Sequence, residues 1–240
     1  MYMQSVIRAI YPPQCVACGD LTDSAYGLCG PCRRDAHFIG DTICDRCGVP
    51  LPGESDGHDL QCDDCMRIAR PWDQGRAALV YTGTGRRLVL GLKHGDRTDL
   101  ARPTAEWMAR KAKPLVRDDT VLVAVPLHRF RLARRRYNQA ALLAHALAKL
   151  MNVAICPDAL LRPIQTKPLE GHSRDARFIA LADAIIPNLR RADRIAGKSV
   201  LLVDDVMTSG ATLAASAEAA RTAGAANVSI VTLARVMKDA

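Results

Sequence analysis

Eight of the nine cysteines in this 240-residue chain lie in one short stretch, and they form four Cys-x-x-Cys pairs. The pairs are Cys15/Cys18, Cys29/Cys32, Cys44/Cys47 and Cys62/Cys65. Two thiolates at this spacing occupy adjacent corners of a zinc tetrahedron, and a second pair closes the site. The segment has few large apolar side chains, so we expect metal binding to supply its folding free energy. The cysteines therefore predict two structural zinc sites with no open coordination position.

The order in which the pairs combine is open, because sequential pairing and an interleaved cross-brace use the same eight cysteines. Gly19 and Gly48 each follow the second cysteine of a pair, where a zinc knuckle tends to need a positive φ. The alternatives to zinc are a disulfide framework, which needs an oxidising compartment, and a redox-active pair. Four consecutive pairs favour metal over both. Cys156 stands alone before Pro157 and is interpreted as a buried thiol.

Charge is spread unevenly along the chain. Residues 1–70 carry 6 Lys/Arg and 10 Asp/Glu, a formal charge of −4, and residues 71–240 carry 27 and 15, a formal charge of +12. We expect a Cys-rich domain over 1–70 and a larger domain over 71–240. A strongly basic domain favours polyanions such as phosphorylated metabolites, nucleic acid or an anionic membrane face, and solubility is the plainer alternative. With no transmembrane run and no signal-peptide pattern, a cytoplasmic protein is expected.

Strand and helix patterns alternate after residue 70. Apolar runs predict strands at 76–83, 120–126, 198–206 and 227–236, with shorter candidates at 153–157 and 158–163. Helical patterns cover 83–95, 99–116 (beginning near Pro103), 135–151, 173–185 and 210–225. This alternation predicts an α/β fold, a parallel sheet with helices on both faces. Its ligand is expected beyond the C-terminal ends of the strands.

The stretch VLLVDDVMTSGAT, Val200 to Thr212, combines an acidic pair with a loop suited to phosphate. Asp204 and Asp205 follow a buried run, and the next residues open a helix. Backbone N–H groups, the helix dipole and the hydroxyls of Thr208, Ser209 and Thr212 suit a phosphate. Gly210 permits close approach of the backbone. A sugar phosphate meets both needs, because its ribose hydroxyls face the carboxylates and its 5-phosphate sits in the loop.

This stretch resembles the phosphoribosyl-pyrophosphate (PRPP) motif of type I phosphoribosyltransferases, in its apolar run, its acidic pair and its Thr-Ser-Gly-x-Thr loop. The resemblance implies that Asp204 and Asp205 hold the ribose and act in catalysis if the protein is an enzyme. It implies Mg²⁺ bound together with PRPP. The implied PRPP-binding residues are Asp204, Asp205, Met207, Thr208, Ser209, Gly210, Ala211 and Thr212. No Gly-x4-Gly-Lys-[Ser/Thr] occurs, which disfavours a P-loop ATPase.

A second resemblance covers nearly the whole chain. The segment VPLHRFRLARRRYNQAALLAHALA is similar to a region of the ComF (competence protein F) family, as is LGLKHGD around Lys93, and four Cys-x-x-Cys pairs ahead of a phosphoribosyltransferase-like domain match the family's double zinc ribbon layout. Arg136, Tyr137, Asn138 and Gln139 lie in the region that is similar to its Arg-Gly-Phe-Asn-Gln signature. The pyrophosphate-binding candidates are Lys93, Pro126, Leu127, His128 and Arg129. The chain departs from the family at Arg135, Tyr137, Leu169 and Ala180.

The ComF resemblance implies a PRPP-binding protein linked to DNA uptake or DNA processing. Single-stranded DNA and the DNA-uptake machinery are the implied partners, and the five arginines between Arg129 and Arg136 fit them. The alternative for that run is a solvated loop that contacts pyrophosphate. The alternative function is an active phosphoribosyltransferase, in which a nitrogen acceptor attacks the anomeric carbon and pyrophosphate leaves. The residues identify no acceptor and leave both functions open.

Overall fold

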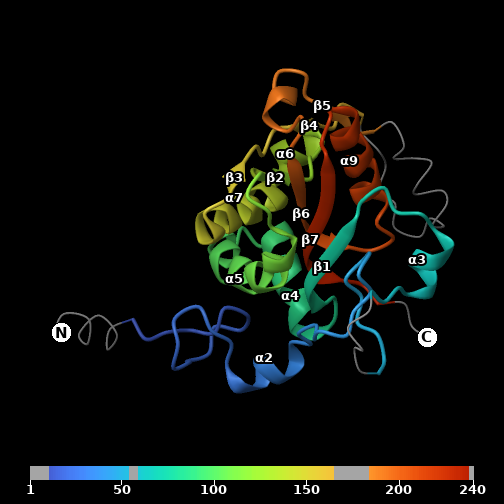
Figure 1. The fold of residues 1–240 in the computed structure, drawn as a ribbon. Helices are drawn as coiled ribbons and strands as arrows, with labels where there is room; N and C mark the ends of the chain where they lie inside the picture. The colour runs from blue at the N-terminus through green and yellow to red at the C-terminus, as the bar shows by residue number, and fades with distance from the viewer. Residues whose placement is uncertain (1–10, 54–58, 165–183, 238–240) are drawn as a thin grey trace.

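The computed structural model describes residues 11–53, 59–164 and 184–237. Figure 1 shows a central sheet with helices on its two faces and the Cys-rich segment beside it. The five sheet strands pair in the order β1-β7-β6-β2-β3, and every pair is parallel. These strands are β1 (Gln74–Val80), β2 (Thr120–Ala124), β3 (Ala154–Ile155), β6 (Ser199–Met207) and β7 (Asn227–Arg235). The α/β prediction with a parallel sheet is confirmed.

The helices of the described segments are α2 (Gly30–Asp35), α3 (Asp63–Arg67), α4 (Gly83–His94), α5 (Ala101–Ala112), α6 (Arg129–Arg135), α7 (Gln139–Met151) and α9 (Ala211–Thr222). The 3-10 turns are η1 (Thr98–Leu100), η2 (Lys113–Leu115) and η3 (Ala192–Arg194). The predicted helix over 173–185 and the family positions Leu169 and Ala180 lie outside the described residues, apart from the end of that helix pattern. None of the described helices has the length and apolarity needed to span a bilayer.

The core lies on both faces of the sheet. All five residues of β2 are buried, as the uninterrupted apolar run predicts for a central parallel strand. Helices α5 and α7 pack together and cover one face, and α9 packs on β6 and β7 from the other (Figure 1). Leu143 and Leu147, one turn apart on α7, are fully buried. The Ala-rich face of α9 allows its backbone to lie close to the strands.

The strand order creates a switch point between β2 and β6, which pair from Thr120↔Ser199 to Ala124↔Val203. From β2 the chain passes through α7 to β3, its neighbour on one side. From β6 it passes through α9 to β7, its neighbour on the other side. Because the two connections leave in opposite directions, their loops separate at the C-terminal ends of these strands. A ligand crevice forms at such a point in open α/β sheets.

Three elements differ from the sequence prediction. Helix α6 falls within the basic run, where no residue is buried and apolar periodicity gives no signal. Helix α7 begins at Gln139 instead of near residue 135, because Arg136 adopts a positive φ of 65° and Asn138 caps the helix. Helix α5 begins at Ala101, two residues before Pro103, because the turn η1 leads directly into it.

A small antiparallel pair stands apart from the main sheet. It joins β4 (Leu160–Leu161) and β5 (Ile186–Pro187), and α9 packs against both strands. The run 158–163 predicted β4, but no pattern had indicated β5. This pair carries Arg162 to the C-terminal edge of the sheet, where it becomes relevant to the site below.

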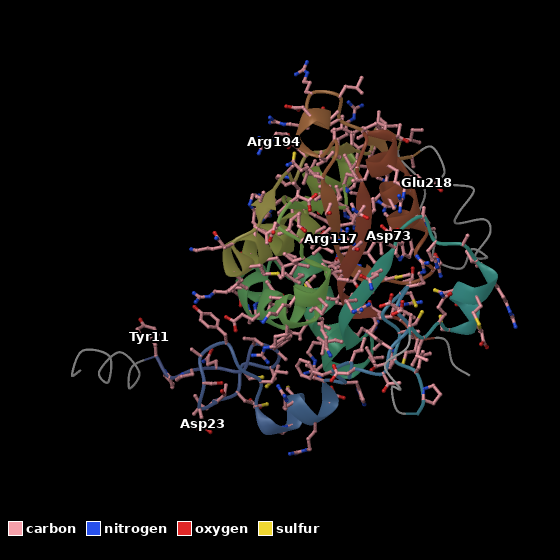
Figure 2. All side chains as sticks on the ribbon, viewed as in Figure 1. Tyr11, Asp23, Asp73, Arg117, Arg194 and Glu218 are labelled. Atoms are coloured by element: carbon pink, nitrogen blue, oxygen red, sulfur yellow. The ribbon has the colours of Figure 1, made fainter. Side chains whose placement is uncertain are left out.

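The Cys-rich segment is tied to the edge of the sheet at several points. Phe38 bridges Leu79 of β1, and Asp45 forms an ion pair of 2.7 Å with Arg76 of the same strand. Arg46 of the segment donates from Nη1 to the carbonyl of Asp73, which lies just before β1 and is labelled in Figure 2, at 2.8 Å. These contacts hold the cysteine segment against the strand that begins the α/β fold.

Candidate functional site

The eight cysteines form two groups of four, and the pairing is sequential. Cys15, Cys18, Cys29 and Cys32 make the first cluster, and Cys44, Cys47, Cys62 and Cys65 make the second. Within each cluster, all four sulfur atoms lie within 4.8 Å of one another. The interleaved alternative is thereby wrong. No disulfide joins cysteines in the described residues, and all nine are free thiols.

The geometry of both clusters fits zinc. The Cys18 and Cys29 sulfurs are 3.6 Å apart, and those of Cys47 and Cys62 are 3.7 Å apart. Four thiolates bound tetrahedrally at ~2.3 Å from a zinc ion have sulfur–sulfur distances of about 3.8 Å. Each cluster offers four cysteine sulfurs, which fill all four positions of a tetrahedral zinc ion and leave none for a substrate. The clusters are therefore of the structural class.

Each cluster opens with a turn that requires glycine. Gly19 N–H donates to Cys15 O at 2.9 Å, and Gly48 N–H donates to Cys44 O at 2.8 Å. The φ angles of the two glycines are 86° and 70°, as their positions after the cysteine pairs predict. At Gly48 a Cβ atom would come within 2.8 Å of the Ala77 nitrogen on β1, so this knuckle touches the sheet directly.

A pocket of about 230 Å³ lies at the switch point between β2 and β6. Most of its polar lining comes from residues that follow these two strands. Basic residues outnumber the two carboxylates, which suits an anionic ligand that also carries hydroxyl groups. Its lining comprises Lys93, Val125, Pro126, Leu127, Arg131, Arg135, Asn138, Gln139, Ala140, Arg162, Asp204, Asp205, Val206, Thr208 and Thr212.

Both aspartates of the acidic pair line this pocket. Asp205 is 5% exposed and forms an ion pair with Lys93 of α4, with 3.2 Å between Nζ and Oδ1. Asp204 Oδ1 accepts the Asp205 N–H at 2.8 Å. Burial and, second, the Asp205 carboxylate raise the pKa of Asp204 to about 7, against the attraction of Lys93. The pocket thus holds the Lys93–Asp205 ion pair and, beside it, a carboxyl whose pKa is about 7.

The loop after β6 presents its hydroxyls to the pocket. Thr208 and Thr212 line the pocket, whereas the side chain of Met207 is buried in the core. Gly210 has a φ of 85°, and a Cβ there would lie 2.7 Å from Met207 Cε and 3.2 Å from Trp72. Helix α9 starts at Ala211, so its N-terminal N–H groups point toward this edge. Ser209, Gly210 and Ala211 contribute backbone to the loop without lining the pocket.

Only the first residues of the loop after β2 line the pocket. Pro126 and Leu127 line it. His128 is buried and caps α6, where its Nδ1 accepts the Phe130 N–H at 3.4 Å. Arg129 is exposed, with its guanidinium 5.1 Å from the centre of the Phe130 ring. His128 and Arg129 are therefore not among the residues that line this pocket, and the cations come from the next turn of α6.

The residues that sequence reasoning missed are mostly basic. Arg131 and Arg135 stand one turn apart on α6 and both line the pocket. Their i, i+4 spacing places them on one face of a helix, but this can be inferred only when the run is known to be helical. Arg162 comes from the β4 end, and its pKa is lowered by burial and by Arg131. No feature of the sequence pointed to Arg162, since it reaches the site from a separate small sheet.

Asn138 and Tyr137 connect the start of α7 to the rest of the site. Asn138 Nδ2 donates to Val125 O at 3.0 Å, and its Oδ1 accepts the Ala140 N–H at 3.0 Å. Tyr137 Oη donates to Leu92 O at 2.9 Å, next to Lys93. The segment singled out by the family signature therefore fastens the β2 loop and the end of α4 to one helix start.

Comparison with known proteins gives two family matches. The double zinc ribbon domain matches residues 6–66, and the phosphoribosyl transferase domain matches residues 139–240. Among solved structures, a hypoxanthine phosphoribosyltransferase from Staphylococcus aureus is 17% identical, with a TM-score of 0.36 over 60% of this chain and 67% of that one.

Full-length relatives are found among curated bacterial proteins. The DNA utilization protein YhgH of Salmonella typhi is 31% identical and covers 89% of this chain and 92% of the relative. Competence protein F of Haemophilus influenzae is 25% identical over 92% of this chain and 96% of its own. Competence protein ComFC of Bacillus subtilis is 27% identical over 87% and 84%.

The parallel sheet, the switch-point pocket and the two cysteine clusters define a phosphoribosyltransferase-fold protein preceded by a double zinc ribbon. The relatives extend this likeness to nearly the full chain. The chain belongs to the ComF family, which includes the YhgH and competence F proteins.

Proposed function

We propose that this protein binds PRPP in the switch-point pocket and acts in the handling of DNA, with residues 1–70 as the zinc ribbon domain and 71–240 as the ligand-binding domain. The single observation that carries the ligand proposal is the pocket itself. It places two carboxylates, two threonines and six basic or amide groups around one volume. No simpler anion would need both the acids and the phosphate loop.

The ligand fits the pocket in three parts. The ribose hydroxyls donate to Asp204 and Asp205, while the 5-phosphate accepts from the Thr208 and Thr212 hydroxyls and from loop N–H groups. The pyrophosphate lies toward Pro126 and Leu127, where Arg131 and Arg135 supply positive charge. Lys93 has three N–H donors, so it is able to contact a phosphate oxygen of the ligand while it remains paired with Asp205.

Magnesium suits this arrangement as a companion of the ligand. Carboxylate and phosphate oxygens are its preferred donors, and it would neutralise charge between the pyrophosphate and ribose oxygens. Only the two cysteine clusters gather three or more metal-ligating side chains among the described residues. The pocket therefore depends on oxygens of the ligand itself to complete a magnesium shell.

The role in DNA handling is supported by the names of the relatives and by the surface of α6. The relatives are a DNA utilization protein and two competence proteins. On α6, Arg129 and Arg134 are exposed, beside the exposed ring of Phe130. A cationic helix with an aromatic ring suits a single strand of DNA. Thiolate clusters of this kind persist in a reducing compartment, in keeping with a cytoplasmic place for this work.

An active phosphoribosyltransferase is the second candidate, favoured by Asp204. A carboxyl with a pKa near 7 beside the ribose is able to hold or release a proton at neutral pH. Ionised, it also stabilises the positive charge that develops on the sugar when pyrophosphate leaves. A nitrogen acceptor would form the new bond to the anomeric carbon as the carbon–oxygen bond to pyrophosphate breaks.

Titration calorimetry with PRPP and Mg²⁺ tests the ligand. Wild-type protein is expected to bind, and the Asp204→Ala/Asp205→Ala double variant to lose most of the affinity at unchanged fold by circular dichroism. Equal binding by both proteins would exclude the acidic pair from the site. Pyrophosphate release in a screen of amines and bases then separates the two candidates, since a binding protein gives none.

A further inference from the structure

Two arginines join the second cysteine cluster to the loop after β6. Arg235, at the end of β7 and 5% exposed, donates from Nη1 to Met207 O at 3.2 Å and to Thr208 O at 2.7 Å. Arg70, from the Cys-rich segment, donates from Nη1 to Ser209 O at 3.0 Å. Three successive carbonyls of the loop are thus held by two cations.

The direction of these carbonyls also sets the direction of the backbone N–H groups that follow them. In a trans peptide the carbonyl and the following N–H point in opposite directions, and the described residues contain no cis bond. Drawing the carbonyls of Met207, Thr208 and Ser209 toward the arginines therefore turns the next three N–H groups away from them. These N–H groups are thereby left on the side of the loop away from the arginines, and Thr208 and Thr212 next to them line the pocket. The two arginines therefore fix the conformation of the loop from the side opposite its N–H groups.

The same arginines reach the cysteine cluster. Arg235 Nη2 lies 3.9 Å from Cys47 Sγ. Arg70 stacks over the ring of Trp72, with 5.3 Å between the guanidinium carbon and the ring centre, and it also packs against Gly210. In the described structure, Arg235 Nε and both Arg70 Nε and Nη2 are buried without a hydrogen-bond partner. A buried guanidinium in this state needs a nearby negative charge.

Metal loading decides whether that charge is present. Four thiolates outweigh the charge of one zinc ion, so a loaded cluster is net negative, whereas four protonated thiols are neutral. Arg235 therefore gains its counter-charge when the second cluster is loaded. An unloaded cluster leaves a buried cation without an anion, which favours its withdrawal from the loop carbonyls.

The first cluster has no comparable link in the described part of the chain. Its contact with a cation is that of Arg87 Nη1 with Cys32 Sγ, at 3.7 Å, and Arg87 belongs to α4, not to the loop after β6. Cys18 of this cluster is exposed. Both clusters consist of four cysteines, but only the second contacts an arginine that also holds the loop after β6 in the described structure. A variant of the first cluster is therefore a control for a variant of the second.

We propose that Arg70 and Arg235 are positioning residues through which metal in the second cluster shapes the loop Met207–Gly210 and sets its affinity for the phosphate of PRPP. The affinity part of this inference rests on the proposed function. The loop part does not, because it concerns the conformation of the free protein.

The test compares five variants with wild type, and the fifth, Arg235→Lys, is described below. Cys62→Ser disables the second cluster and Cys18→Ser disables the first. Arg70→Met removes one positioning residue, and Arg67→Met is its control, because Arg67 is exposed on α3 in the same segment. Three quantities are measured: zinc content, PRPP affinity with Mg²⁺, and the methyl NMR signal of Met207, assigned by its loss in Met207→Leu. The Met207 methyl lies directly beside Gly210 and reports on the loop.

Cys62→Ser and Arg70→Met are expected to weaken PRPP binding about tenfold, the factor for one charged hydrogen bond, and to shift or broaden the Met207 signal. Arg70→Met keeps its full zinc content, which separates loop positioning from metal binding. Cys18→Ser and Arg67→Met leave both readouts near wild type. Arg235→Lys keeps the cation without the planar fork and is expected to behave like Arg70→Met.

Two results would overturn the inference. One is an equal effect of Cys18→Ser and Cys62→Ser on the Met207 signal. The other is a wild-type Met207 signal in Arg70→Met. If wild type does not bind PRPP, the proposed function fails, and the NMR comparison alone decides the loop inference. If Arg235→Lys does not fold, Arg70→Met carries the test.

Discussion

Lys93 and Asp205 form an ion pair inside the switch-point pocket, with 3.2 Å between Nζ and Oδ1 and side chains that are 19% and 7% exposed. The pair joins the end of α4 to β6, so it contributes to the fold as well as to the site. It also divides the roles of the two aspartates. Asp205 is the partner of Lys93, and Asp204 is the carboxyl with the raised pKa.

The first prediction concerns this pair. Lys93→Met is expected to destabilise the protein by about 1–3 kcal/mol, because it leaves a buried carboxylate without its cation. The double variant Lys93→Met/Asp205→Asn should recover most of that loss, since no buried charge is then left alone. Urea unfolding of the four proteins of this cycle measures the coupling. Additive effects in the cycle would show that the pair contributes nothing.

The second prediction concerns Asp204 and pH. Its folded-state pKa of about 7 lies above its ordinary value of 3.8, so the folded protein holds this proton more tightly than the unfolded chain does. The stability contributed by the protonated form is fully present below pH 4 and is lost as pH rises through 7. Asp204→Asn has no such proton. We expect the variant to be more stable than wild type by about 1 kcal/mol or more at pH 8 and to be similar at pH 4.

Chemical unfolding of both proteins at several pH values measures this difference. Other titrating groups are common to the two proteins and cancel in the comparison. A difference that does not change between pH 4 and pH 8 would mean that Asp204 titrates normally, and it would remove the argument for proton transfer by this residue.

The third prediction concerns zinc content. Elemental analysis is expected to find two zinc equivalents per chain, and one in Cys18→Ser or Cys62→Ser. Loss of the second cluster should lower the unfolding temperature of the whole protein more, because Cys44, Cys47 and Cys65 pack in the same core as Trp72 and Leu79. Cys18 is exposed, so its loss is expected to act more locally. Metal-free protein with disulfides by thiol titration would contradict the zinc assignment.

Local sequence patterns predicted the central strands and the zinc pairs well, because both depend on neighbours in the chain. The run at 120–126 is apolar throughout and gives a wholly buried strand. Gly19 and Gly48 have the positive φ that their place after a cysteine pair requires. Acidic residues at the end of an apolar run likewise placed Asp204 and Asp205 at the C-terminal edge of the sheet.

Contacts between distant segments were beyond such patterns. Arg162 reaches the pocket from the β4–β5 pair, and Arg70 reaches the loop from 139 residues away in sequence. The position of His128 in the structure was also not predictable from local pattern. The Pro126–Leu127–His128 loop suggested a ligand contact, whereas the structure buries the His128 ring as the N-cap of α6. No residue of α6 is buried, so the sequence has no apolar periodicity from which this helix could be predicted.

The fourth prediction separates the two faces of α6. Arg131 and Arg135 line the pocket, whereas Arg129 and Arg134 are exposed and do not. Two double variants remove the same charge from different faces: Arg129→Ala/Arg134→Ala and Arg131→Ala/Arg135→Ala. The first is expected to weaken single-stranded DNA binding, and the second to weaken PRPP binding.

Salt dependence gives the sharper measurement. Each phosphate neutralised on a single strand contributes about 0.7 to the slope of log affinity against log salt. Removing Arg129 and Arg134 should therefore lower that slope by up to about 1.4 and leave PRPP affinity near wild type. Because these two arginines lie outside the pocket, saturating PRPP is expected to leave their contribution in place. If both double variants lower the slope equally and PRPP abolishes the difference, DNA binds across the pocket itself. If neither changes DNA affinity, the arginines of α6 serve only the pyrophosphate, and DNA contact must be sought on another surface.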